Sequence, residues 1–232
     1  MIELKGKYNS AKVFTDNVED EVISQIIQLL NQDFVSGGKV RIMPDTHAGA
    51  GCVIGFTADL GDKVIPNLVG VDIGCGMILV KLGQIDINLE KLDDIIHKYI
   101  PSGYNVHEGR IARFPKLQEL YCYRNLRDTK RIERSIGTLG SGNHFLEVNV
   151  NKNNDKYLVI HSGSRNLGHQ VATFYQNLAI DLCSGKEEYY IKRDEIIKTY
   201  KEQGKRKEIQ KALIDLKRRY KDLQPNYPKE LC

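Results

Sequence analysis

Short apolar runs separated by glycine, proline and aspartate fill residues 39–80 and constrain the fold of this chain more than any other feature. The runs read KVRIMP, CVIGFTA, NLVGVDIG and MILVKL. Apolar runs of this length, bounded by turn-forming residues, are typical of strands joined by tight turns. Helical periodicity appears on both sides of this region. Strands and helices in such irregular order predict an α+β fold.

Helices are predicted wherever apolar residues recur at a spacing of three and four. The clearest example follows a cap at Asn88 and ends before Pro101, with Leu89, Ile95 and Tyr99 expected to face inward. The strands HFLEVNV and YLVIH flank the polar segment NKNNDK, which predicts a hairpin. The predicted helices are 18–31, 88–99, 115–126, 166–183 and a long charged stretch at 187–221 that Gly204 weakens.

Composition excludes several classes of protein. The 232 residues contain 34 Lys+Arg, 30 Asp+Glu and five cysteines. The five scattered cysteines do not suggest a disulfide framework, and no apolar run has the length of a membrane span or a secretory signal. We therefore expect a cytoplasmic protein with no membrane partner. The excess positive charge lies in residues 186–232, with 14 basic against 9 acidic side chains, so the overall pI is weak evidence for nucleic-acid binding.

Three glycine-rich segments carry side chains suited to metal binding. Asp72 and Cys75 follow an apolar run in VGVDIGCGM, where glycines let the backbone approach a ligand closely. His144 and His161 each lie at an end of a predicted strand beside Gly and Ser. One carboxylate, one thiolate and two imidazoles together suit a borderline transition metal. Taken singly, Asp72 could cap a turn, Cys75 could be a small core residue, and each histidine could be structural.

Two further positions have open interpretations. Asp45 precedes His47 in MPDTHAGAG, and a turn-stabilising aspartate with a supporting histidine is favoured there over a direct ligand. Arg165, in HSGSRNLG, follows a strand and precedes a helix, where a guanidinium and backbone N–H groups could hold a phosphate. A surface ion pair explains Arg165 equally well. The sequence contains no GxxxxGK[ST] loop and no GxSxG elbow, so any nucleotide is bound without those motifs.

Four segments in the order MPDTHAGAGCVIGFTA, VGVDIGCGM, GTLGSGNHFLEV and VIHSGSRNLGHQVA resemble the RtcB family of RNA-splicing ligases. The resemblance covers roughly residues 40–175. It implies an enzyme that joins an RNA 3′-phosphate or 2′,3′-cyclic phosphate to a 5′-hydroxyl. It also implies GTP and two Mn²⁺ ions as cofactors, and a histidine that is guanylated by GTP. The same resemblance suggests a monomer and identifies no activating protein partner.

The resemblance also implies roles for individual residues. It assigns Asp72, Cys75, His144 and His161 as metal ligands, with the cysteine bridging two ions. Mn²⁺ usually takes oxygen and nitrogen donors, so the thiolate leaves Zn²⁺ as a competitor. Arg165 would hold a phosphate and Asp45 would support the site. Contacts to the nucleotide are implied for Asn143 (its phosphates) and for Phe145 and Glu147 (its guanine).

One part of the family pattern has no counterpart in these 232 residues. None of the six histidines lies in a segment that matches the guanylated histidine, which belongs to the family's C-terminal region. We therefore expect the N-terminal part of a ligase. Residues 1–185 would form a partial catalytic core that holds the metal-binding half, and 186–232 would lead towards the missing region.

Two other classes of function remain open on the sequence alone. The chain could be a non-catalytic protein that binds RNA or another partner and retains the metal half-site. In that case the basic segment 186–221 would contact phosphates, although a solvated helix pair with i,i+4 ion pairs fits it at least as well. Alternatively, the four ligands could form a closed structural zinc site.

Overall fold

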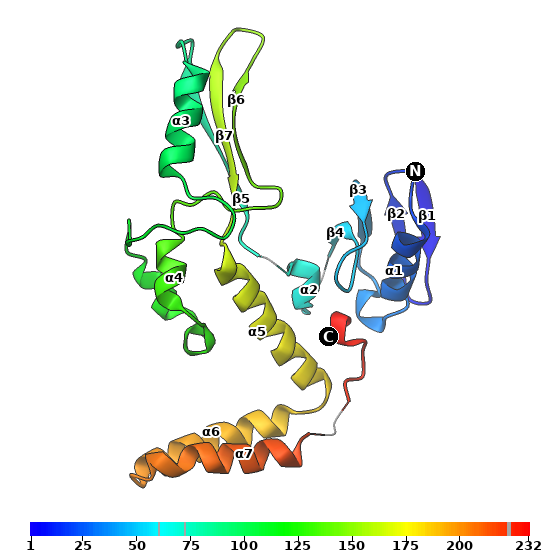
Figure 1. Cartoon of the computed structure of the whole chain (residues 1–232). Coiled ribbons are helices and arrows are strands. Elements are labelled where there is room, and N and C mark those ends of the chain that lie inside the picture. The colour runs from blue at the N-terminus through cyan, green and yellow to red at the C-terminus, as the bar shows by residue number, and fades with distance from the viewer. Residues whose placement is uncertain (60, 72, 222–223) are drawn as a thin grey trace. The chain divides into compact units, whose positions relative to one another are not determined.

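The structure is a computed structural model that describes residues 1–59, 61–71, 73–221 and 224–232 (Figure 1). The chain forms two compact units. The first comprises Met1–Val69 and Tyr175–Cys232, and the second comprises Gly70–Phe174. The long helix α5, Asn166–Cys183, contributes residues to both units. The domain boundary expected after residue 185 stays a prediction.

A four-stranded sheet forms the centre of the first unit, with the strand order β1-β2-β3-β4. Strands β2 and β3 run parallel, and the other neighbouring pairs are antiparallel. The first two strands were not expected from the sequence, because each alternates apolar and polar residues over only four positions. The strands are β1 (Ile2–Lys5), β2 (Ser10–Val13), β3 (Val40–His47) and β4 (Ile54–Ala58).

Helix α1, Asp20–Leu30, contributes a continuous apolar stripe to the core of this unit. Its Asp20 and Glu21 lie in the first turn, where carboxylates interact favourably with the helix dipole. Burying each large aliphatic side chain of the stripe stabilises the fold by about 1.5–3 kcal/mol. The helix predicted at 18–31 is confirmed. The fully buried residues of this core include Ala11, Val13, Ile26, Leu29, Leu30 and Ile42.

Two helices extend the first unit, and Gly204 separates them as predicted. Helix α6 spans Glu187–Glu202, and α7 spans Ile209–Arg219. Gly204 has a φ of 71°, a left-handed conformation that glycine adopts without strain and that ends a helix. A further short helix, α2 at Pro66–Val69, replaces the strand expected for NLVG, because Pro66 can begin a helix but cannot donate to a sheet.

The second unit is built on a three-stranded antiparallel sheet with the order β5-β7-β6. Its strands are β5 (Gly76–Gly83), β6 (Phe145–Val150) and β7 (Lys156–Ser162). The predicted hairpin at NKNNDK is confirmed, because β6 and β7 pair directly from Val150 and Lys156 inward. Figure 1 shows this hairpin beside β5.

Helix α3, Leu89–Tyr99, begins as predicted behind Asn88, whose side chain accepts a hydrogen bond from the Lys91 N–H at 2.9 Å. The prediction that Leu89, Ile95 and Tyr99 face inward is wrong. Leu89 is 62 % exposed, and Ile95 and Tyr99 are also exposed. Strand β5 is similar, since Met77, Ile78 and Leu79 are each more than 60 % exposed although they alternate between the two faces of the sheet.

The helix predicted at 115–126 is wrong. The chain forms two 3₁₀ helices there, Pro115–Glu119 and Tyr123–Asn125, because Leu120 between them has an extended backbone. A short helix that the sequence analysis missed, α4 at Thr129–Arg134, follows a left-handed Asp128 whose carboxylate caps it. In the described part of the chain, no helix combines the length and the apolar character needed to cross a bilayer.

Candidate metal centre

Sheet topology brings three of the predicted metal ligands to one end of the second unit's sheet. Strands β5 and β6 both run antiparallel to β7, so their first residues and the last residues of β7 meet at the same end. Cys75 directly precedes β5, His144 directly precedes β6, and His161 is the next-to-last residue of β7. Residues far apart in sequence are therefore adjacent because the strands are paired.

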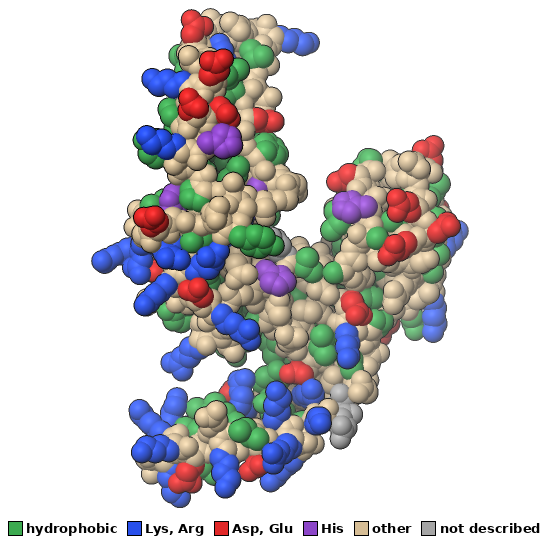
Figure 2. All heavy atoms as spheres, viewed as in Figure 1, with side chains coloured by type: hydrophobic (Ala, Val, Ile, Leu, Met, Phe, Trp, Pro, Cys, Tyr) green, Lys and Arg blue, Asp and Glu red, His purple; other side chains and the backbone are tan. Residues whose placement is uncertain are grey.

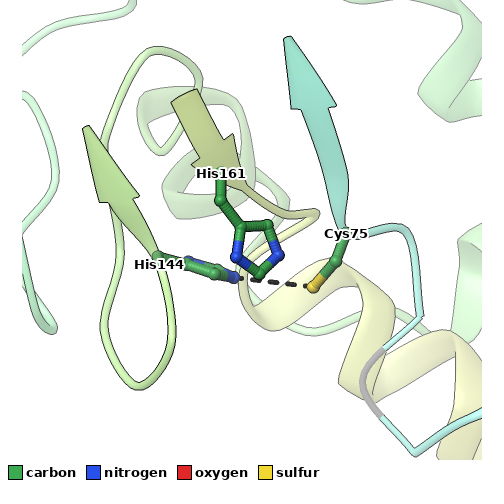
Figure 3. Close-up of side chains that lie close together, drawn as sticks. All are labelled: Cys75, His144 and His161. Atoms are coloured by element: carbon green, nitrogen blue, oxygen red, sulfur yellow. Dashed lines mark hydrogen bonds between the residues drawn. The ribbon is translucent and has the colours of Figure 1, made fainter. Parts of the chain in front are cut away.

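The three side chains converge closely enough to share a metal ion (Figure 3). One ligand atom from each of Cys75, His144 and His161 lies within 4.8 Å of the others. The Cys75 Sγ atom is 3.5 Å from His144 Nε2, and the two imidazole rings meet edge to face at 5.2 Å. A thiolate and two imidazoles form a donor set suited to Zn²⁺ and other borderline transition metals.

Backbone carbonyls orient both imidazoles. His144 Nδ1 lies 3.0 Å from the Leu139 carbonyl oxygen, and His161 Nδ1 lies 2.9 Å from that of Asn143. A carbonyl can only accept, so Nδ1 carries the proton in the neutral rings and the Nε2 lone pair is available to a metal. Supporting contacts of this kind are typical of histidines that ligate metals. The Leu139 carbonyl also accepts a hydrogen bond from Ser162 Oγ at 2.8 Å, which ties β7 to the same loop.

Two glycines leave the space that the ligands occupy. A Cβ atom at Gly163 would lie 2.8 Å from Cys75 Sγ and 3.2 Å from His144 Nε2. A Cβ atom at Gly140 would lie 2.3 Å from His144 Nδ1, and Gly140 also has a φ of 104°. Any other residue at either position would displace a ligand. These two glycines could not be recognised as part of the site from the sequence, because their role depends on contacts across the fold.

Asp72, the fourth predicted ligand, lies outside the described residues. The neighbouring turn is well defined, since the Ser164 hydroxyl donates to the Ile73 carbonyl oxygen. Gly168 on α5 packs against the same carbonyl so closely that a Cβ atom there would clash. The segment that delivers Cys75 is therefore held against the start of α5 by residues of the HSGSRNLG motif.

Arg165 lies beside the centre in a strained backbone conformation. Its φ of 59° is left-handed, which a residue other than glycine adopts at a cost of about 1 kcal/mol or more. The guanidinium donates to the Gly103 carbonyl oxygen, and its buried Nε has no partner among the described residues. Arg165 and His144 both line a cavity of about 490 Å³, together with Arg131 and His169. The two guanidinium groups, of Arg131 and Arg165, outnumber the one carboxylate of the lining, Asp128, so the cavity is suited to an anionic ligand.

The predicted nucleotide-binding residues extend from the metal centre along β6. Phe145 pairs with His161 across the sheet, and the two rings meet edge to face at 5.5 Å. Glu147 lies on the same face two residues further on, exposed, and accepts a hydrogen bond from Asn149 at 2.8 Å. Asn143 is exposed and contributes its backbone carbonyl to His161.

Asp45 belongs to the other unit, on β3, where the pairing with β4 shifts register between Ile42 and His47. It is exposed, and its backbone carbonyl accepts a hydrogen bond from His47 Nδ1 at 2.9 Å. The structure therefore places Asp45 in a strand instead of the expected turn, and His47 contacts its backbone and not its carboxylate. A role for Asp45 at the metal centre stays a prediction.

The other thiols show how different Cys75 is. Cys52 is buried in the core of the first unit, and burial raises the pKa of its thiol to about 11. Burial and a hydrogen bond with Cys183 raise the pKa of the Cys232 thiol to about 12. Metals bind thiolates rather than thiols, so Cys52 and Cys232 are poorly suited to bind one. Cys75, by contrast, is exposed, so a metal ion could reach its sulfur from solvent.

Comparison with known proteins identifies the family. The sequence model described as tRNA-splicing ligase RtcB matches residues 25–121 and 122–208. The chain belongs to the RtcB family. It is 30% identical over 185 residues to RNA-splicing ligase RtcB1 of Escherichia coli strain ATCC 25922, a match that covers 70% of this chain and 45% of that protein. The tRNA-splicing ligase RtcB of Archaeoglobus fulgidus is 34% identical over 189 residues, covering 57% of this chain and 38% of that protein.

The family match includes most of the segment that builds the metal centre, since both matched ranges together contain Cys75, His144 and His161. The chain spans less than half the length of these relatives. The α+β fold predicted from the sequence is confirmed by the helices and the two sheets.

Proposed function

We propose that this chain carries the metal- and phosphate-binding part of an RNA ligase, which joins RNA 3′-phosphate or 2′,3′-cyclic phosphate ends to 5′-hydroxyl ends. The convergence of Cys75, His144 and His161 in a member of the RtcB family is the observation that carries the proposal. The relatives are RNA-splicing and tRNA-splicing ligases, and they supply the substrate class of the proposal.

The donor set fits a catalytic metal better than a closed structural one. Cys75 is exposed, so the centre can accept an oxygen ligand from a substrate, as catalytic sites do and closed structural zinc sites do not. A metal held by Cys75, His144 and His161 would neutralise charge on phosphoryl oxygens during transfer. The proposal includes two Mn²⁺ ions and Asp72 as a further ligand, with Zn²⁺ as the competing ion because of the thiolate.

Residues around the centre then have defined tasks. Arg165 holds the RNA 3′-phosphate in the cavity that it shares with His144, where the Gly103 carbonyl fixes its guanidinium. Asn143 contacts the phosphates of GTP. Phe145 and Glu147 contact guanine from the face of β6 that also presents His161, where a carboxylate can accept hydrogen bonds from the base.

Metal binding is tested on the full chain with Co²⁺, whose thiolate complexes absorb in the near ultraviolet. We expect a thiolate band that disappears in Cys75→Ser and weakens at least tenfold in apparent affinity in His144→Ala and His161→Ala. The control is His97→Ala, which changes an exposed histidine on α3 that pairs only with Asp93 among the described residues. An unchanged band in Cys75→Ser would rule out this centre.

Substrate selection is tested with two RNA oligonucleotides that differ only at the 3′ end. In Mn²⁺, the chain should bind the 3′-phosphate form at least tenfold more tightly than the 3′-hydroxyl form. Arg165→Ala should remove the preference because the phosphate loses its charge-assisted hydrogen bonds. Arg124→Ala, at an exposed site of the same unit, should retain it. Equal binding of both oligonucleotides by the unmodified chain would contradict the proposal.

The nucleotide step is tested with radiolabelled GTP and Mn²⁺. We expect these 232 residues to acquire no covalent label, because none of the six histidines matches the guanylated histidine that the family resemblance implies. An acid-labile label on this chain would show that the nucleophile lies within it and that the assignment of roles must be redrawn.

A further inference from the structure

The excess of positive over negative charge in the C-terminal helices lies in one stretch. Residues 205–221, which include α7, contain eight Lys and Arg but only two acidic residues, Glu208 and Asp215. The preceding residues 186–204, which include α6, contain five of each sign. We call residues 205–221 the basic segment. Figure 2 shows Lys and Arg side chains gathered over α6 and α7.

The charges of the basic segment are exposed, and most form no ion pair with another described residue. All eight of its Lys and Arg residues are solvent-exposed. Within the part of the chain that the structure describes, Arg218 is the one that forms an ion pair, with Asp215 at 3.6 Å. The i,i+4 pair of this region, Lys192 with Glu188, lies on α6 instead. Ion pairs within the helix therefore account for part of the charge of α6. They do not account for the excess positive charge of the basic segment.

Most apolar side chains of α7 and of the residue that follows it are at least partly covered. Leu216 is 5% exposed, and Tyr220 meets Tyr189 of α6 edge to face at 5.7 Å. Ile214 is 49% exposed, and a single half-exposed isoleucine does not form the apolar face that a membrane-binding helix needs. The exposed side of the basic segment therefore offers mainly charge and hydrogen-bond donors. A partner that is recognised through a repeated negative charge fits this surface.

We propose that the basic segment binds the phosphodiester backbone of RNA. At 1.5 Å per residue, its 17 residues extend over about 25 Å where helical, far more than one terminal phosphate occupies. The segment is therefore suited to contact several consecutive phosphates without reading bases. This role is separate from the 3′-phosphate cavity and does not require the chain to catalyse ligation.

The test uses a fluorescent single-stranded RNA with a 3′-hydroxyl, in EDTA, so that neither a metal nor a terminal phosphate contributes. Lys205→Gln/Lys211→Gln/Lys217→Gln should weaken binding at least tenfold and lower the slope of log K against log salt by about 2. The matched control, Lys192→Gln/Lys198→Gln/Lys201→Gln, removes the same charge from α6 and should change affinity less than twofold. Circular dichroism verifies that both triple variants keep their helices.

Three outcomes would overturn the proposal. They are equal weakening by both triple variants, no measurable RNA binding by the unmodified chain, and binding of polyglutamate or of phosphatidylserine vesicles as tight as that of RNA. The result also separates this proposal from the ligase function. In Mn²⁺, the variant of the basic segment should keep its preference for a 3′-phosphate, which depends on Arg165 and the metal centre.

Discussion

The two units of this chain use their apolar residues differently. In the first unit, α1 and the sheet bury Ile26, Leu29 and Ile42 completely. In the second unit, β5 leaves Met77 and Leu79 more than 60% exposed while the end of the same sheet is packed tightly around Cys75, His144 and His161. The first unit is therefore defined by a core, and the second by the close backbone packing of its site. Mutations should distinguish the contribution of the buried core in the first unit from that of the backbone packing around the site in the second.

The largest expected effect is the loss of a core side chain in the first unit. Ile26→Ala removes three carbons from a fully buried position and should lower the free energy of unfolding by about 3–4 kcal/mol. Ile78→Ala on β5, at a site that is 61% exposed, should change it by less than about 0.5 kcal/mol. Urea denaturation followed by circular dichroism measures both. Equal losses of unfolding free energy in the two variants would show that β5 is covered in solution. The two units would then not differ in how they bury apolar residues.

The buried thiol of the first unit should make stability depend on alkaline pH. The pKa of Cys52 is raised from an ordinary 9.0 to about 11 by burial, so the unfolded state loses this proton first. The stabilisation is complete below pH 9 and declines towards pH 11, by roughly 2–3 kcal/mol in total. Subtracting the unfolding profile of Cys52→Ala from that of the unmodified chain isolates this slope. A Cys52→Ala chain whose stability declines between pH 9 and pH 11 as steeply as that of the unmodified chain would contradict this assignment.

Crowding at the metal centre should affect ligand binding more than folding. Gly163→Ala places a methyl group 2.8 Å from the Cys75 sulfur and should weaken metal binding 10- to 100-fold, measured by Co²⁺ titration. Gly76→Ala is the matched control, because a Cβ atom at that position meets nothing within 4 Å. A control variant that binds metal as poorly as Gly163→Ala would show that the strand, and not the space beside the sulfur, sets the affinity.

The smallest expected effect concerns a polar contact in the first unit. The Tyr190 hydroxyl donates to Asp181 at 2.7 Å, and burial and this hydrogen bond raise the pKa of the tyrosine. Tyr190→Phe should cost about 1 kcal/mol of unfolding free energy. Tyr189→Phe keeps the ring contact with Tyr220 and should be nearly neutral in thermal denaturation. A larger loss in Tyr189→Phe than in Tyr190→Phe would assign the stabilisation to the rings instead of the hydroxyl.

Local signals in the sequence were sufficient for some elements. The apolar stripe of α1, the cap at Asn88, the β6–β7 turn and the break at Gly204 each depend on a few neighbouring residues, and all were predicted correctly. Local signals fail at two places. The apolar run after Pro66 was predicted to be a strand, but Pro66 begins a short helix. Pro115 was predicted to begin a full helix, but the backbone becomes extended at Leu120.

The candidate site was predictable in its residue types but not in its packing. Cys75, His144 and His161 could be selected because each is adjacent to an apolar run, and the sheet places all three at one end. The roles of Gly140 and Gly163 could not be selected, because each depends on a residue that is distant in sequence: Arg165 for Gly140 and Cys75 for Gly163. The left-handed backbone of Arg165 is likewise invisible in a sequence, since nothing local favours it.

The pairing of β5 with β7 has a kinetic consequence. Strands β6 and β7 close a turn of five residues, from Val150 to Lys156, whereas Met77 pairs with His161 across more than eighty residues. Short loops close faster and at a lower entropic cost than long ones. We therefore expect the hairpin to bring the two imidazoles together early in folding and the thiol to arrive late. A metal ion present during refolding would meet a pair of histidines first, and the chain would complete its coordination only when β5 docks.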